Sequence, residues 1–117
     1  MRVLVADDNA LVRRGVINIV VNELGLQICG EASDGSEAIR KTSDLQPDLI
    51  LLDVSMPGIN GFDTARVLRR NHPSAKILIM SQHDPIPMLP HALQVGADGC
   101  VDKAKLRADL GKAIQAL

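Results

Sequence analysis

Five short apolar segments spaced along the chain restrict the fold more than any other feature of the sequence. Each is too short for a long helix and too continuously apolar for a strand with one wet face, so each is typical of a strand buried on both sides. The segments are Arg2–Ala6, Leu26–Cys29 with a continuation toward Ala32, Asp48–Leu52, Lys76–Met80 and Gly99–Asp102. The third is the most apolar, so we expect it at the centre of a parallel sheet.

The stretches between these segments carry helix signals. Asn9 is a suitable N-cap and Gly25 a suitable C-terminal residue for a first helix. Further helices are expected from Ser36 to about Leu45, from Asn60-Gly61 to Arg70, and from Leu106 to Leu117. The apolar residues at helical spacing in the first helix are Leu11, Val12, Val16, Ile19, Val20 and Leu24. Strands alternating with helices predict an α/β, doubly wound sheet with helices on both faces.

Three prolines fall where a helix should follow the fourth strand. Proline is tolerated in the first turn of a helix, but an interior proline costs about 3 kcal/mol. We therefore predict a long irregular loop after Ser81, followed by a short helix from about Pro90 to about Val95. A regular helix already formed at Asp84 would contradict this prediction. The prolines are Pro85, Pro87 and Pro90.

Composition excludes several classes of function. The formal net charge of −1 gives no global basic surface for nucleic acid. Phe62 is the only aromatic residue among Phe, Trp and Tyr, which weighs against flavin stacking and single-stranded nucleic acid platforms. Two small arginine clusters are interpreted as solvated helix faces. They consist of Arg13 and Arg14, and of Arg66, Arg69 and Arg70.

The two cysteines and the absence of targeting signals bear on location. Cys29 and Cys100 form no CxxC pattern, and we interpret both as buried free thiols in a reducing compartment. No signal peptide follows Met1, and no apolar run approaches the roughly 20 residues needed to span a bilayer. These features predict a soluble, cytoplasmic protein with no membrane partner.

Reactive or charged residues follow four of the five predicted strands. They are Asp7 and Asp8, Asp53, Ser81 and Lys103. Taken singly, each has an ordinary explanation as a helix cap, a turn residue or a solvated charge. In a parallel sheet, however, the carboxyl ends of the strands meet at one edge, where ligands bind. Three carboxylates crowded there require a cation or shifted protonation, and Mg²⁺ suits such oxygen ligands.

The same residues supply the parts of a phosphoryl-transfer site. A carboxylate can attack phosphorus and form an aspartyl phosphate. Transfer depends mainly on alignment and on neutralising the phosphoryl oxygens. The metal would cover one oxygen, Lys103 a second, and the hydroxyl of Ser81 a third.

At this point the chain resembles bacterial two-component response-regulator receiver domains. The matching pieces are Val5-Ala-Asp7-Asp8, Leu51-Leu-Asp53-Val-Ser-Met-Pro57-Gly58, Asn60-Gly61, Met80-Ser81, and Gly96-Ala-Asp-Gly99 followed by Lys103. The resemblance implies a flavodoxin-like (CheY-like) sheet of five parallel strands in the order 2-1-3-4-5. It also implies that residues 1–117 form one receiver domain.

The resemblance assigns a role to each site residue. Asp53 would be phosphorylated by a phosphohistidine on a sensor histidine kinase. Asp8 would bind Mg²⁺ directly, Asp7 mostly through water, and Ser55 through its backbone carbonyl. Ser81 would swing toward the phosphoryl group as the switch, and Lys103 would pair with that group. Receivers catalyse their own phosphorylation and slow dephosphorylation but act as switches rather than enzymes.

The resemblance extends to a branch with a LuxR-type helix-turn-helix output, through the stretch Gly30–Ala38. DNA would then be contacted only through an output domain that is not in this chain. The chain is either a receiver excised from a longer regulator, which we prefer, or a stand-alone receiver. A homodimer on phosphorylation is a further expectation from the family.

Three features depart from the family pattern, namely Cys100, the three prolines after Ser81, and Ala104. Cys100 stands where receivers usually carry Tyr or Phe, so we hypothesise that activation relies on repacking of loops and helices. Ala104 replaces a common proline, which makes a trans peptide after Lys103 the default. His83 is either a solvated loop residue or a group that faces the phosphoryl site and affects hydrolysis.

Other functions remain as alternatives. A haloacid dehalogenase-type phosphatase also uses a strand-end Asp with Mg²⁺. It needs a DxD motif after the first strand, whereas Asp7 and Asp8 are adjacent, and it usually needs a cap domain as well. A flavin binder needs a phosphate loop and aromatic rings that are missing. A degenerate receiver that binds partners without phosphorylation stays open because of Cys100 and the prolines. The intact residues that argue against it are Asp8, Asp53, Ser81 and Lys103.

Overall fold

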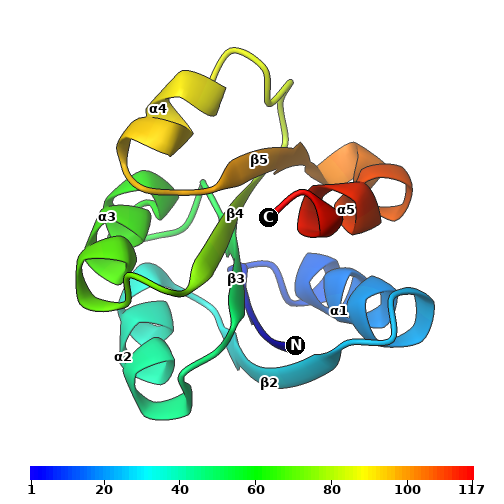
Figure 1. The fold of residues 1–117 in the computed structure, drawn as a ribbon, viewed down its shortest axis with the longest axis horizontal. Coiled ribbons are helices and arrows are strands. Elements are labelled where there is room, and N and C mark those ends of the chain that lie inside the picture. Colours follow the sequence, from blue (N-terminus) through cyan, green and yellow to red (C-terminus); the bar gives the residue numbers. More distant parts are fainter.

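The computed structural model describes residues 1–117 and places a parallel sheet between two layers of helices (Figure 1). The strands lie in the order β2-β1-β3-β4-β5, and every neighbouring pair is parallel. This confirms the predicted order and the central place of the third strand. The strands are β1 (Arg2–Ala6), β2 (Gln27–Ala32), β3 (Leu49–Asp53), β4 (Lys76–Ser81) and β5 (Gly99–Asp102).

The helices divide between the two faces of the sheet. In Figure 1, α1 and α5 lie on one side of the strands, while α2 and α3 lie on the other. The α-helices are α1 (Ala10–Asn18), α2 (Gly35–Leu45), α3 (Gly61–Asn71), α4 (Leu89–Gln94) and α5 (Leu106–Gln115). No helix is both long and apolar enough to cross a membrane.

Two hydrophobic clusters, one on each face, form the core. Successive side chains of a strand point to opposite faces, so Ile50 and Leu52 pack toward α2 and α3 while Leu49 and Leu51 pack toward α1 and α5. All five residues of β3 are buried. Burial on both faces explains why this strand has an uninterrupted apolar sequence rather than an alternating one.

The two cysteines lie on the two edge strands of the sheet. Both are free and only partly buried, so the prediction that they are buried thiols is wrong. Cys29 is on β2 and Cys100 is on β5, and each strand has a neighbour on one side only. An edge position leaves part of the side chain uncovered. Burial still raises the pKa of Cys100 to about 11, so its thiol is protonated at neutral pH.

The first helix begins as predicted but ends differently. Asn9 caps α1, because its side chain accepts hydrogen bonds from the amides of Leu11 and Val12. Regular α-helix ends at Asn18, and the chain continues as a π-helix, η1 (Ile19–Glu23). Gly25 then follows with φ of +68°, as expected of a helix-terminating glycine. Hydrophobic spacing does not distinguish an α-helix from a short π segment, which explains the missed change.

The segment after β4 agrees with the prediction from its prolines. No regular helix is present at Asp84, and α4 covers only Leu89–Gln94. Pro90 occupies the first turn of this helix, where a missing amide is tolerated. All peptide bonds are trans, including the one between Lys103 and Ala104.

Arg69 is not part of a solvated face, in contrast to our interpretation of its cluster. Its guanidinium forms an ion pair with Asp98 at 2.8 Å and donates to the carbonyls of Gly96 at 2.7 Å and Ala75 at 2.6 Å. These contacts join the end of α3 to the start of β4 and to the turn before β5. The carbonyl partners are backbone atoms, which a sequence pattern cannot reveal.

Candidate functional site

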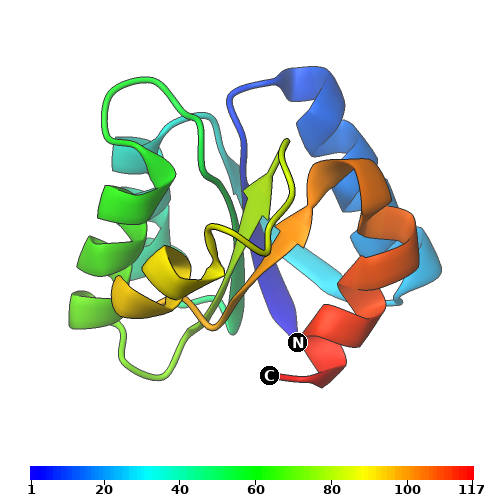
Figure 2. The ribbon, with the colours of Figure 1, turned by 90° about the horizontal axis from the view of Figure 1, so that it is seen from above.

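The register of the sheet brings the predicted site residues to one edge. Ala6 pairs with Leu52, so Asp7 and Asp53 follow on adjacent strands. Ser81 pairs with Asp102, the residue before Lys103. Figure 2 shows the loops that follow the strands at the upper edge and both chain termini at the opposite edge. Residues far apart in the sequence therefore meet beyond the carboxyl ends of β1, β3, β4 and β5.

Three carboxylates form the centre of this edge. Asp7, Asp8 and Asp53 each place a carboxylate oxygen within 4.8 Å of the others. Asp7 is 0% exposed and Asp53 is 2% exposed, whereas Asp8 is exposed to solvent. The site is therefore a buried pair of carboxylates with a third at its mouth.

Lys103 is the cation that faces the buried pair. Its Nζ lies 2.7 Å from Oδ2 of Asp7 and 3.1 Å from Oδ1 of Asp53. The Lys103 side chain is 8% exposed, so it is not a solvated charge. A short 3-10 turn, η2 (Lys103–Lys105), follows β5 and is capped by the side chain of Asp102.

Backbone amides hold the carboxylates and Ser81 in place. The amide of Asn9 donates to Oδ1 of Asp7 at 2.9 Å, and the amide of Ser55 donates to Oδ1 of Asp53 at 3.2 Å. The hydroxyl of Ser81 is buried and accepts a hydrogen bond from the amide of His83 at 3.0 Å. The turns after the strands therefore orient these side chains.

Burial and charge shift the protonation of this cluster. Burial raises the pKa of Asp53 above its ordinary value of 3.8, and the neighbouring charge of Asp7 raises it further. The hydrogen bond from the Ser55 amide and the contact with Lys103 lower this pKa but do not cancel the rise. Burial alone would lower the pKa of Lys103, but its contacts with Asp7 and Asp53 outweigh burial and raise that pKa. Lys103 is therefore charged at neutral pH. Ionisation of Asp53 lowers the stability of the folded protein relative to the protonated form, unless further positive charge is bound nearby.

The raised pKa of Asp53 predicts a pH-dependent effect of Asp53→Asn on the metal-free protein. The folded state binds this proton more tightly than the unfolded state, so stability falls as the pH rises through the folded pKa. Asparagine cannot ionise, so the variant should unfold a few degrees higher than wild type at neutral pH. Calorimetry should show the difference shrinking as the pH falls toward 3.8. A difference that grows on acidification would contradict the prediction.

The donor atoms fit a divalent cation. Lys103 is the only cation paired with Asp7 and Asp53, and a single ammonium group cannot neutralise three clustered carboxylates. The remaining negative charge favours a further cation at this edge. Carboxylate oxygens are the ligands that Mg²⁺ prefers. Asp7, Asp8 and Asp53 could therefore hold Mg²⁺.

Of the remaining predicted site residues, Ser55 and His83 lie in loops next to the carboxylates, and Cys100 lies away from them. Ser55 is exposed, two residues beyond Asp53. His83 is exposed in the loop after β4, and only its amide is bound to Ser81. Cys100 pairs with Ile79 within the sheet and packs against the cluster beneath α2 and α3, so it is not at the site edge.

Gly61 packs against the backbone at Asp53, a role that the sequence analysis did not assign to it beyond a helix start and a family motif. A Cβ atom on Gly61 would overlap the carbonyl oxygen of Asp53 and Cα of Val54. The amide of Gly61 also donates to the carbonyl of Val54 at 2.9 Å. The loop after β3 thus closes against this glycine, and the Asn60-Gly61 motif was the available signal.

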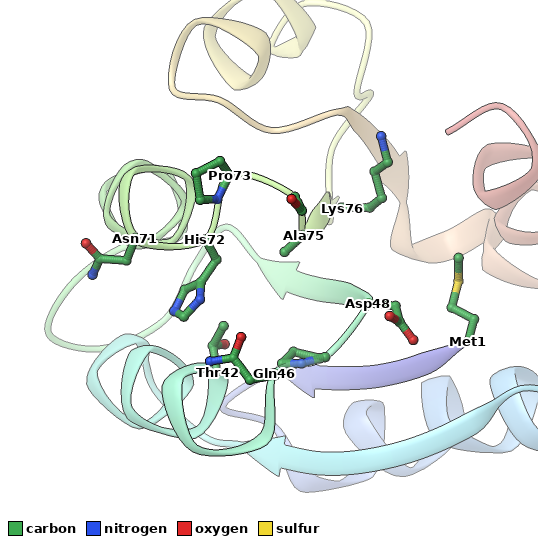
Figure 3. A pocket seen from close by; sticks show the side chains of 11 residues that line it. Met1, Thr42, Gln46, Asp48, Asn71, His72, Pro73, Ala75 and Lys76 are labelled. Atoms are coloured by element: carbon green, nitrogen blue, oxygen red, sulfur yellow. The ribbon is translucent and has the colours of Figure 1, made fainter.

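The largest cavity of the protein lies elsewhere (Figure 3). It has a volume of about 620 Å³ and lies between the C-terminal ends of α2 and α3, where residues such as Thr42, Gln46 and His72 line it. None of the aspartates of the site, nor Ser81 or Lys103, lines this cavity. The charge cluster, rather than the largest cavity, therefore marks the candidate site.

Comparison with known proteins agrees with this arrangement. The family model of the response regulator receiver domain matches residues 3–115. The response regulator GacA of Pseudomonas viridiflava is 39% identical over 115 residues, which cover 98% of this chain and 54% of GacA. The chain thus spans about half the length of the curated relatives it matches.

Solved structures show the same similarity. A two-component response regulator of the LuxR family from Aurantimonas sp. SI85-9A1 has a TM-score of 0.91 and 32% identity, over 98% of this chain and 82% of that one. The signal receiver domain assigned to NarL of Mycobacterium tuberculosis has a TM-score of 0.89 and 35% identity, over 98% and 93%. These matches argue against the phosphatase and flavin-binding alternatives. The chain belongs to the response regulator receiver domain family.

Proposed function

We propose that this domain is a phosphoacceptor switch of a two-component system, in which Asp53 takes the phosphoryl group. The observation that carries the proposal is the position of Asp53, buried between Asp7 and Lys103 at the carboxyl edge of the sheet. Its carboxylate is held by the Ser55 amide and stands at the end of the most buried strand. A fixed, partly desolvated carboxylate beside a cation is suited to nucleophilic attack on phosphorus.

The surrounding residues have separate roles in this proposal. Bound Mg²⁺ would neutralise charge on the phosphoryl oxygens. Asp8 would bind the ion directly, Asp7 mostly through water, and Ser55 through its carbonyl. Lys103 would turn from the carboxylates to the phosphoryl group, because an aspartyl phosphate carries more charge than the carboxylate it replaces. Ser81 would donate its hydroxyl to a phosphoryl oxygen.

The transfer itself is a displacement at phosphorus. An oxygen of Asp53 forms a bond to phosphorus while the bond from phosphorus to the donor nitrogen or oxygen breaks. The leaving group departs with the electron pair, as neutral histidine after protonation or as acetate when acetyl phosphate is the donor. We propose that a sensor histidine kinase supplies the phosphohistidine, and that autophosphorylation and slow autodephosphorylation occur at the same site.

The response to phosphorylation would pass from Ser81 to the loop before α4. The hydroxyl of Ser81 accepts a hydrogen bond from the amide of His83, so movement of this hydroxyl would release the start of that loop. The loop carries three prolines and leads to the short α4. With Cys100 in place of an aromatic ring, we propose that repacking of this loop transmits the signal, and that His83 modulates hydrolysis.

The wider role is proposed from the relatives. Residues 1–117 would act as one receiver domain within a regulator that controls transcription through a helix-turn-helix output domain. DNA would be contacted only through that output domain. Phosphorylation would promote a homodimer.

Intact mass after incubation with Mg²⁺ and acetyl phosphate tests the acceptor. Wild-type protein should gain one phosphoryl group, and Asp53→Asn should gain none. Asp44→Asn, an exposed carboxylate on α2, serves as a control that should react like wild type. Absence of an adduct with acetyl phosphate and with phosphoramidate would instead favour a degenerate receiver that acts by binding partners.

A further inference from the structure

Asp8 is the carboxylate of the site with the least support from other side chains. It is exposed, and no hydrogen bond or ion pair holds its side chain. Asp7 and Asp53, by contrast, are buried and bound by backbone amides. The direction of the Asp8 carboxylate therefore depends on how the backbone before it is held.

Arg13 holds that backbone from α1. Its Nη1 donates to the carbonyl oxygen of Asp7 at 2.6 Å, and its Nε donates to Oε1 of Glu31 on β2 at 2.9 Å. The amide of Asp7 is bound in turn to the carbonyl of Ala32 at 3.0 Å. The carbonyl of Asp7 and the amide of Asp8 belong to one planar peptide unit. Fixing that carbonyl therefore fixes the starting direction of Asp8.

The contact pattern distinguishes Arg13 from Lys103. The guanidinium touches a backbone carbonyl of the site and none of its carboxylates, so it does not occupy an oxygen that a metal would use. Its charge is paired with the carboxylate of Glu31. The Arg13 side chain is 18% exposed, whereas Arg14 beside it is exposed and makes no ion pair.

We infer that Arg13 is a positioning residue for the metal site, which orients Asp8 toward a bound divalent cation through the Asp7 carbonyl. The inference rests on the proposed function, because it presupposes that Mg²⁺ binds these aspartates. Glu31 anchors the guanidinium from the neighbouring strand. The planar fork of arginine suits this task, because it reaches the carbonyl and Glu31 at once, which a single ammonium group cannot do in the same geometry.

Mg²⁺ titrations of Arg13→Gln and Arg14→Gln test the inference, because both variants remove the same charge from the same helix. Loss of a positive charge near the site should by itself leave Mg²⁺ binding equal or slightly tighter. That result is expected for Arg14→Gln. Arg13→Gln should instead weaken binding about tenfold, the effect typical of losing a group that supports a metal ligand. Amide NMR signals of Asp8 and Asp53 provide the readout.

Two further measurements exclude a general loss of structure. The metal-free midpoint of thermal unfolding reports folding of each variant, and Glu31→Gln keeps Arg13 while removing its anchor. Glu31→Gln and Arg13→Lys should each weaken Mg²⁺ binding less than Arg13→Gln does. At saturating Mg²⁺, the phosphorylation rate of Arg13→Gln with acetyl phosphate should recover toward the wild-type rate.

The outcomes separate this inference from the proposed function. If the wild-type protein binds Mg²⁺ and the Mg²⁺ dissociation constants of Arg13→Gln and Arg14→Gln are equal, the positioning role alone is overturned. If Arg13→Gln does not fold, wild-type affinity in both Glu31→Gln and Arg13→Lys would overturn it as well. No saturable Mg²⁺ response in the wild-type protein would overturn the proposed function and the inference together.

Discussion

Replacing Lys103 by methionine should destabilise the metal-free protein by about 3 to 5 kcal/mol, because it leaves two buried carboxylates without a cation. Lys103 is the only ion-pair partner of Asp7 and of Asp53. Both carboxylates are almost fully buried, so water cannot replace the lost charge. Methionine keeps a similar length and an apolar stem, which limits the change to the ammonium group.

Three measurements define the result for Lys103→Met. Urea unfolding without metal should show the loss of stability, and added Mg²⁺ should restore a large part of it by binding the folded state. Lowering the pH should also narrow the difference in stability from wild type, since the raised pKa of Asp53 lets this carboxylate take up a proton and lose its unpaired charge. A protein that folds only with Mg²⁺ would be the extreme form of the same result.

Lys105→Met is the matched control for this substitution. Lys105 ends the same 3-10 turn, carries the same charge and is exposed, so its replacement should change stability by less than about 0.5 kcal/mol. Equal stability of the two variants at every pH would show that the buried carboxylates do not depend on Lys103. The comparison removes any effect of net charge, because both variants lose one positive charge.

Gly61→Ala should destabilise the protein by about 2 kcal/mol or more. The added methyl group would overlap the carbonyl of Asp53 and Cα of Val54, which are backbone atoms rather than flexible side-chain ends. Relief requires movement of the loop that follows β3, and that loop carries the Ser55 amide bound to Asp53. Phosphorylation by acetyl phosphate should therefore slow together with the loss of stability.

Gly15→Ala gives a control of opposite sign. Gly15 lies within α1, and no atom outside its own helix lies within 4 Å of the added Cβ. Alanine is the better helix former, so this variant should gain about 0.5 to 1 kcal/mol. Urea unfolding of both variants measures the contrast. Unchanged stability in Gly61→Ala would mean that the loop after β3 can move without strain.

The strands, most helix starts and the edge at which the charged residues meet could be predicted from the sequence. Short apolar runs indicate strands that are buried on both faces, because a central parallel strand such as β3 has no solvated side. Asn9 predicts the start of α1 because its side chain caps the helix through a local hydrogen bond. The prolines around Pro87 predict the late start of α4. All these signals depend on neighbours within a few residues, which a pattern can represent.

The partners of the charged side chains, by contrast, could not be predicted from the sequence. Lys103 is buried and paired, Arg69 and Arg13 bind backbone carbonyls, and the cysteines are half-covered on edge strands. Each of these facts depends on atoms from distant parts of the chain that packing brings together. A charged residue looks the same in the sequence whether its side chain contacts water or a buried partner. Its burial and its partner are properties of the folded arrangement.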